Sequence, residues 1–151
     1  MKDTIRSTKE IINDMLSKDP TRIWSGSCDI ISLGQNHNRI MEFIPYLDCM
    51  KESTKNINLG GLLRPNRRLL NKAFETIEFH KLNKTCPCSL FGEDSNPVSL
   101  QKENDVTIVK TSHLDQSNYV DYYMVRCNQC NQLYKVEERQ YHYFWWNWIP
   151  Q

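Results

Sequence analysis

The sequence lacks any long hydrophobic run and any marked excess of one charge. No apolar stretch approaches the roughly 20 residues that a membrane-spanning helix needs. The N-terminal stretch carries acidic residues and no apolar segment of the kind that a secretory signal contains. The 19 Lys and Arg nearly balance the 18 Asp and Glu, which excludes the strongly basic signature of a general nucleic-acid binder. With 39% hydrophobic residues among 151, these absences predict a cytoplasmic globular protein of one domain, or of two small units.

Recognisable catalytic motifs are missing as well. The sequence has no phosphate-cradling glycine loop, no GxSxG, no HExxH and no His/Glu spacing that suits hydrolysis. The sequence contains only 5 glycines, and a pair such as Gly60-Gly61 is common in ordinary loops. A binding protein rather than an enzyme is therefore expected.

Six cysteines are present, and their spacing divides them into two kinds. Cys28 and Cys49 stand alone among apolar residues and are predicted to be small, buried hydrophobic side chains. The other four form two close pairs, Cys86-Pro-Cys88 and Cys127-Asn-Gln-Cys130. Without an export signal the thiols are expected to stay reduced. Two short thiolate pairs that a fold brings together are what a tetrahedral metal ion needs.

The second pair lies between two strand-forming segments, residues 122–126 and 133–136, so it is expected at the turn of a hairpin. It resembles the zinc knuckle of zinc-ribbon proteins. We predict one zinc ion held by all four paired cysteines, and a structural role for it, because four thiolates leave no coordination position for water. A redox-active cysteine pair is the alternative, although a thioredoxin-like CxxC should open a helix. His80 and His113 are the substitute ligands if one cysteine does not bind.

Hydrophobic periodicity predicts helices in the first half of the chain. They cover residues 3–17, 20–34, 38–53 with a kink or restart at Pro45, and 65–82. Over residues 28–33 a strand is the alternative. Residues 19–47 resemble HEAT-type repeats, which are antiparallel helix pairs.

Strand patterns dominate the second half. Residues 105–110 alternate, the knuckle hairpin follows, and residues 141–148 contain three Trp, two Tyr and one Phe. In this last segment we expect Tyr141, Tyr143 and Trp145 to point inward. The prediction is an α+β fold, with a HEAT-like helical unit over residues 1–84 and a small, zinc-ribbon-like antiparallel sheet over residues 85–151.

Charge is segregated between these halves. Residues 1–84 carry 14 basic and 10 acidic side chains, whereas residues 85–151 carry 5 and 8. Part of the basic excess recurs at i, i+3, i+4 and i+8 along one helix flank, at Arg64, Arg67, Arg68 and Lys72. This basic stripe, with Trp146 and Trp148 of the aromatic end, is the hypothetical partner surface; a solvated helix face is the alternative.

Three features together resemble the small immunity proteins of bacterial polymorphic-toxin and contact-dependent inhibition systems. They are the segment of residues 59–67 before a helix, the two cysteine pairs, and the aromatic segment 141–148. The resemblance implies stoichiometric binding and inactivation of a cognate toxin domain in the cytoplasm. The alternative is a zinc-ribbon nucleic-acid-binding or transcription-associated module, with the basic stripe on phosphates and bases stacked on aromatic rings.

Overall fold

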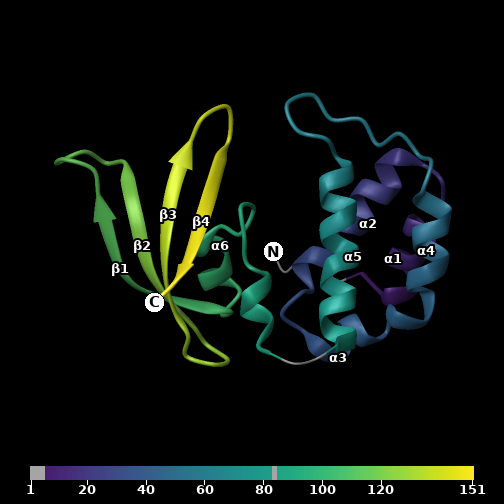
Figure 1. Ribbon diagram of the computed structural model, residues 1–151, viewed down its shortest axis with the longest axis horizontal. Coiled ribbons are helices and arrows are strands. Elements are labelled where there is room, and N and C mark those ends of the chain that lie inside the picture. The colour runs from purple at the N-terminus through teal and green to yellow at the C-terminus, as the bar shows by residue number, and fades with distance from the viewer. Residues whose placement is uncertain (1–5, 83–84) are drawn as a thin grey trace. The chain divides into compact units, whose positions relative to one another are not determined.

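The computed structural model describes residues 6–82 and 85–151 and has an α+β fold, with the helices first and an antiparallel sheet after them (Figure 1). This order of helices and strands confirms the predicted fold class. The chain divides into a helical unit, which runs up to Pro87, and a sheet unit, Cys88–Gln151. Among the described residues, none of the helices combines the length and apolar character that crossing a membrane would require.

The helices of the helical unit begin at side chains that suit helix N-termini. Ser7 and Glu10 form a capping box, in which each side chain accepts a hydrogen bond from the other's backbone N–H. Asp19 accepts from two backbone N–H groups and precedes Pro20 at the first helical position. Because α2 runs from Pro20 to Ser32, the predicted helix is confirmed and the strand alternative over residues 28–33 is wrong. The elements are α1 (Thr8–Met15), α2 (Pro20–Ser32), α3 (His37–Met41), the 3₁₀ turn η1 (Ile44–Tyr46), α4 (Leu47–Thr54) and α5 (Arg67–Leu82).

The interruption predicted at Pro45 is observed. Residues 3–5 of the first predicted helix lie outside the described part of the chain. The third predicted helix is divided into α3, η1 and α4, because Pro45 has no N–H to donate to the preceding turn.

One apolar face of each helix forms the core of this unit. Gly26 of α2 allows α1 to approach closely, since a Cβ there would lie 3.0 Å from the sulfur of Met15. The buried cluster includes Ile11, Met15, Ile23, Ile30, Ile40, Phe43, Met50, Leu70, Ala73 and Ile77.

Neither single cysteine belongs to this buried set. Cys28 is half-buried and Cys49 is exposed, so the prediction of buried side chains is wrong. On α4 the buried positions are Leu47, Met50 and Thr54. Because successive helical residues are rotated by about 100°, Cys49 points away from that face although its neighbours are apolar.

The sheet unit is a meander of four antiparallel strands in sequential order (Figure 1). Its strands are β1 (Val106–His113), β2 (Val120–Cys127), β3 (Leu133–Gln140) and β4 (Phe144–Pro150). The 3₁₀ turn η2 (Pro87–Leu90) and helix α6 (Pro97–Lys102) precede them, and α6 packs against β1.

The aromatic C-terminal segment is only partly a strand. Tyr141 is 79% exposed, because it lies in the turn between β3 and β4, where its N–H donates to the carbonyl of Tyr143. The prediction that Tyr141 points inward is therefore wrong. Tyr143 and Trp145 are half-buried, and so are Trp146 and Trp148 on the following strand positions.

Candidate metal centre

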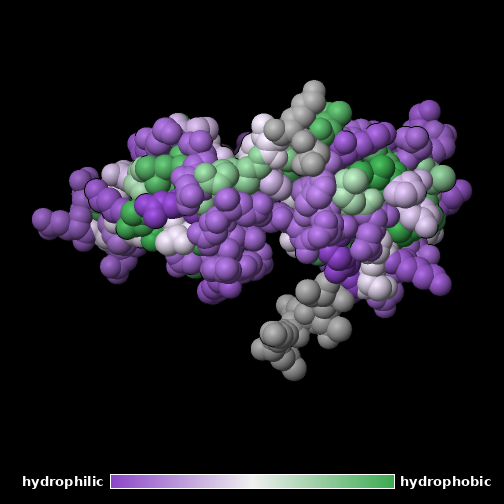
Figure 2. All heavy atoms as spheres, turned by 90° about the horizontal axis from the view of Figure 1, so that it is seen from below, coloured by the Kyte–Doolittle hydropathy of each residue, from purple (hydrophilic) through white to green (hydrophobic). Residues whose placement is uncertain are grey.

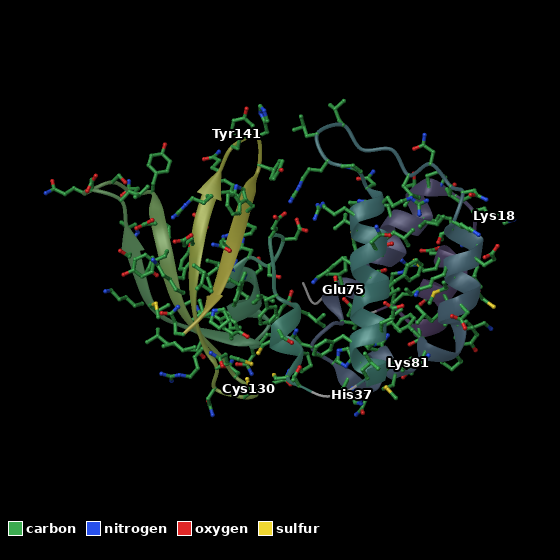
Figure 3. All side chains as sticks on the ribbon, viewed as in Figure 1. Lys18, His37, Glu75, Lys81, Cys130 and Tyr141 are labelled. Atoms are coloured by element: carbon green, nitrogen blue, oxygen red, sulfur yellow. The ribbon has the colours of Figure 1, made fainter. Side chains whose placement is uncertain are left out.

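Four cysteine sulfurs gather close together. The Sγ atoms of Cys86, Cys88, Cys127 and Cys130 all lie within 4.8 Å of one another. Those of Cys88 and Cys130 are 3.6 Å apart, far beyond the about 2.05 Å of a disulfide bond. Figure 3 shows Cys130 at the turn between β2 and β3, at the opposite end of the sheet from Tyr141. This sulfur cluster could hold a metal ion.

The β2–β3 turn presents Cys127 and Cys130 through a closed backbone loop. The N–H of Cys127 donates to Gln132, and its carbonyl accepts from Asn131 at 3.0 Å. Asn131 has φ of 65°, a left-handed conformation that asparagine tolerates better than most residues. The backbone N–H of Asn128 also donates to Asp105, which ties the turn to the start of β1.

The CxC pair is presented by a tight turn. Pro87 opens η2, which carries Cys88, while Cys86 lies immediately before it. The carbonyl of Cys88 accepts from the N–H of Phe91 at 3.1 Å. Cys88 and Cys127 are buried, Cys86 is half-buried and Cys130 is exposed. The site is therefore enclosed on one side and reaches the surface on the other.

Hydrogen-bond donors surround the buried sulfurs. The hydroxyl of Tyr134 lies 3.1 Å from the sulfur of Cys88, and the N–H of Gln129 donates to the sulfur of Cys127 at 3.4 Å. Burial, and then the contact with Cys88, raises the pKa of Tyr134 above its usual value. The phenol therefore keeps its proton and can donate it to a thiolate. Such donors stabilise negative charge that burial would otherwise penalise.

Aromatic rings cover the same end of the sheet. Trp148 packs edge-on against Tyr134, with ring centroids 5.3 Å apart, and against Phe91 at 4.7 Å. Its indole N–H donates to the carbonyl of Ser95 at 3.0 Å, and that of Trp146 donates to Glu138 at 2.9 Å. Both tryptophans proposed as partner contacts thus make defined contacts inside the sheet unit.

The two substitute ligands lie away from the sulfur cluster. His80 is buried in the helical unit, where its Nε2 is 2.6 Å from the carbonyl of Gly34 and its Nδ1 is 2.9 Å from Nδ1 of His37. His113 ends β1, whereas Val106, at the other end of that strand, pairs with Cys127. The structure therefore brings together the four cysteines without either histidine.

The hydrogen bonds of His80 determine its tautomer. A carbonyl oxygen only accepts, so Nε2 of His80 carries the proton and its Nδ1 accepts from His37. Burial, outweighing the contact with Gly34, lowers the pKa of His80 below its usual value. The pair is a partly buried polar contact of the helical unit.

The basic stripe is less exposed than its spacing suggests, since all four residues are half-buried. The guanidinium of Arg67 donates to the carbonyls of Thr54 and Ile57 at 2.9 and 2.5 Å. Lys72 lies 3.6 Å from the carboxylate of Glu75. Arg67 thus connects α5 to the end of α4, a role that its place in the sequence does not reveal.

Four sulfurs complete a tetrahedral coordination sphere, so an ion held here would have no open position for water or substrate. The arrangement can therefore stabilise a fold, and it is unsuited to activating a nucleophile. Comparisons with protein-family models, curated proteins and solved structures find no match to this chain.

Proposed function

We propose that the chain is a non-catalytic binding protein whose sheet unit is held together by one structural zinc ion. The observation that carries this proposal is the sulfur cluster of Cys86, Cys88, Cys127 and Cys130. Tetrahedral zinc with bonds of about 2.3 Å to sulfur requires sulfurs about 3.8 Å apart. The 3.6 Å between Cys88 and Cys130 agrees with that requirement.

The ligand chemistry favours zinc over other ions. Thiolates select soft or borderline metals and disfavour magnesium and calcium, which prefer oxygen ligands. An iron–sulfur cluster is also bound by four cysteines, but its several irons and sulfides hold the cysteine sulfurs farther apart. All four sulfurs within 4.8 Å suit a single ion.

The specific binding activity that we propose is neutralisation of a protein toxin domain. Its support is the resemblance of residues 59–67, of the two cysteine pairs and of the aromatic C-terminal segment to immunity proteins of bacterial toxin systems. A closed metal site is consistent with such a protein, because an inhibitor needs a stable scaffold and no turnover of its own.

The test is co-expression with the toxin domain encoded next to this chain. We expect the chain to restore growth of cells that produce the toxin and to form a stoichiometric complex with it. A catalytically inactive toxin should bind equally well, which separates binding from toxicity. Absence of any adjoining toxin reading frame, or failure to bind its product, would contradict the proposal.

The same purified protein tests the alternative. A nucleic-acid-binding module would retain RNA or DNA with an affinity that falls steeply as salt rises, because phosphate contacts release counterions. That result, in the absence of toxin binding, would replace our proposal by the nucleic-acid alternative.

A further inference from the structure

The long loop between α4 and α5 carries two adjacent apolar side chains that are exposed. Leu62 is 99% exposed and Leu63 is 63% exposed. Figure 1 shows the loop extending beyond the N-terminal end of α5. Elsewhere, polar residues dominate the face in Figure 2 and apolar residues form only small patches. Single exposed leucines are common, but two adjacent leucines projecting from a loop indicate a contact site.

The ends of this loop are held together by hydrogen bonds. The backbone N–H of Asn66 donates to the carbonyl of Gly60 at 2.9 Å, and its side chain donates to the carbonyl of Leu59 at the same distance. The side chain of Asn58 accepts from the N–H of Gly60. Leu59 itself is buried in the core. We call residues 59–66 the leucine loop.

The path of the leucine loop requires glycine. Gly60 and Gly61 have φ of 69° and 115°, which favour glycine. A Cβ on Gly61 would lie 2.1 Å from the carbonyl oxygen of Arg64, so any side chain there would force the loop to change. Part of the conformational freedom that docking would otherwise remove is therefore already lost, which favours tight binding.

The sequence in and beside the leucine loop is basic. Between Glu52 and Glu75 the sequence contains no acidic residue and has the basic residues Lys55, Arg64, Arg67, Arg68 and Lys72. A partner surface next to the leucines should therefore be acidic, because like charges would oppose association.

We propose that the leucine loop inserts Leu62 and Leu63 into an apolar pocket with an acidic rim on a protein partner. This inference rests on the proposed function, so the partner is the toxin domain. A membrane is the less favoured occupant. Two leucine side chains have fewer carbons than one myristoyl chain, and that chain alone gives only marginal membrane binding. A loop closed by hydrogen bonds also suits a pocket of fixed shape better than a fluid interface.

The experiment compares Leu62→Ser/Leu63→Ser with Leu82→Ser, in titrations against the purified toxin domain. Leu82 is a matched control because it is 67% exposed and lies in the same unit at the end of α5. We expect the double variant to bind about tenfold or more weakly, and the control to bind like the wild type. Both should keep the wild-type melting temperature, because these leucines are exposed.

A charge reversal tests the acidic rim. Arg64→Glu should slow association with the toxin domain, most visibly at low salt, whereas Lys81→Glu on the last turn of α5 should not. Equal association rates for both variants would contradict the inference that the partner pocket has an acidic rim.

The outcomes separate the loop from the proposed function. If the toxin domain binds the wild type and the double leucine variant equally, the loop inference is overturned and the proposed function remains. If the toxin domain does not bind the wild type, both fail. If the wild type, but not the double variant, sediments with phosphatidylcholine–phosphatidylserine vesicles, the leucine loop binds membranes. That result would overturn the proposal of a protein partner for the loop.

Discussion

Cys88 is one of the two buried cysteines of the sulfur cluster. It is 3% exposed, and a thiolate at that depth loses most of its hydration. The hydroxyl of Tyr134 at 3.1 Å replaces part of that hydration. In metal sites such outer contacts fix the orientation of a ligand and adjust its affinity for the ion.

Replacing Tyr134 by Phe should therefore weaken zinc binding by about tenfold. The ring and its packing against Trp148 remain, so only the hydrogen bond to the sulfur is lost. Competition with a chromophoric chelator measures the affinity. Tyr119→Phe is the control, since Tyr119 is 70% exposed. Equal zinc affinity in the two variants would argue against a role for the Tyr134 hydroxyl.

The ligand set makes a direct prediction for metal content. Wild-type protein should contain one zinc ion per chain, and Cys127→Ser should lose it, because a serine hydroxyl is a far weaker zinc ligand than a thiolate. Cys49→Ser should keep the metal, since Cys49 is exposed and outside the sulfur cluster. Elemental analysis by mass spectrometry gives the stoichiometry. Wild-type protein purified without zinc would refute the assignment.

His80 makes the stability of the helical unit dependent on pH. Its pKa is below the usual value of 6.5, so between the folded and unfolded pKa values the unfolded chain binds more protons. The stability that neutral His80 contributes to the folded state is fully present above about pH 6.5. It is lost progressively as the pH falls toward the pKa of His80 in the folded protein.

Urea unfolding at several pH values tests this prediction. The wild type should lose more stability between about pH 7.5 and 5.5 than His80→Gln does. Burial raises the pKa of Asp105 to about 6, so this carboxyl also titrates in the same pH range, but it is common to both proteins. An identical pH dependence would show that His80 does not titrate on unfolding.

At the scale of elements, the sequence predicts what depends on local chemistry. Helix caps, the helix interruption at Pro45 and the strands beside the CxxC turn follow from nearby residues. The cysteine cluster was predictable because metal ligation restricts spacing so strongly. The predictions that Tyr141 points inward and that Cys49 is buried are wrong. The burial of Tyr141 depends on where a strand ends, and that of Cys49 on which helix face meets the core. The leucine loop lies within residues 59–67, a segment that the sequence analysis singles out. The exposure of its leucine side chains can be seen only in the three-dimensional structure.

Arg67 is an example of a contact between elements that periodicity cannot reveal. Arg67→Ala removes two hydrogen bonds to carbonyls at the end of α4 and in the following loop. We expect a loss of about 1.5–3 kcal/mol in the free energy of unfolding, as for hydrogen bonds from charged groups. Lys72→Ala should cost less than about 1 kcal/mol, because its ion pair with Glu75 is partly exposed. Equal losses on urea unfolding would remove the special role of Arg67.

At the scale of the whole molecule, the two units differ in what stabilises them. The helical core is a cluster of apolar residues between Ile11 and Ile77. In the sheet unit the buried hydrophobic residues are fewer: Cys88, Leu90, Val106, Tyr123, Val125, Cys127, Tyr134 and Val136. Two of these eight belong to the sulfur cluster, so the candidate metal site is part of the core of the sheet unit.

Removing zinc should therefore unfold the sheet unit and leave the helical unit folded. Metal-binding energy is folding energy in a unit with few buried residues, so the unit loses that energy when the ion is removed. Hydrogen exchange measured by mass spectrometry, before and after chelation, reports on each segment. Peptides from β2 and β3, which carry or flank the CxxC turn, should lose protection, whereas those from α2 and α5 should keep it.

Restoring zinc is the control for this experiment, because refolding of the strands should then return their protection. The variant Cys130→Ser should behave like the chelated wild type even when zinc is present, since it lacks one ligand of the cluster. If peptides of α5 lose protection together with those of β3, the two units unfold as one. Zinc would then stabilise the whole chain, and the leucine loop would depend on the metal as well.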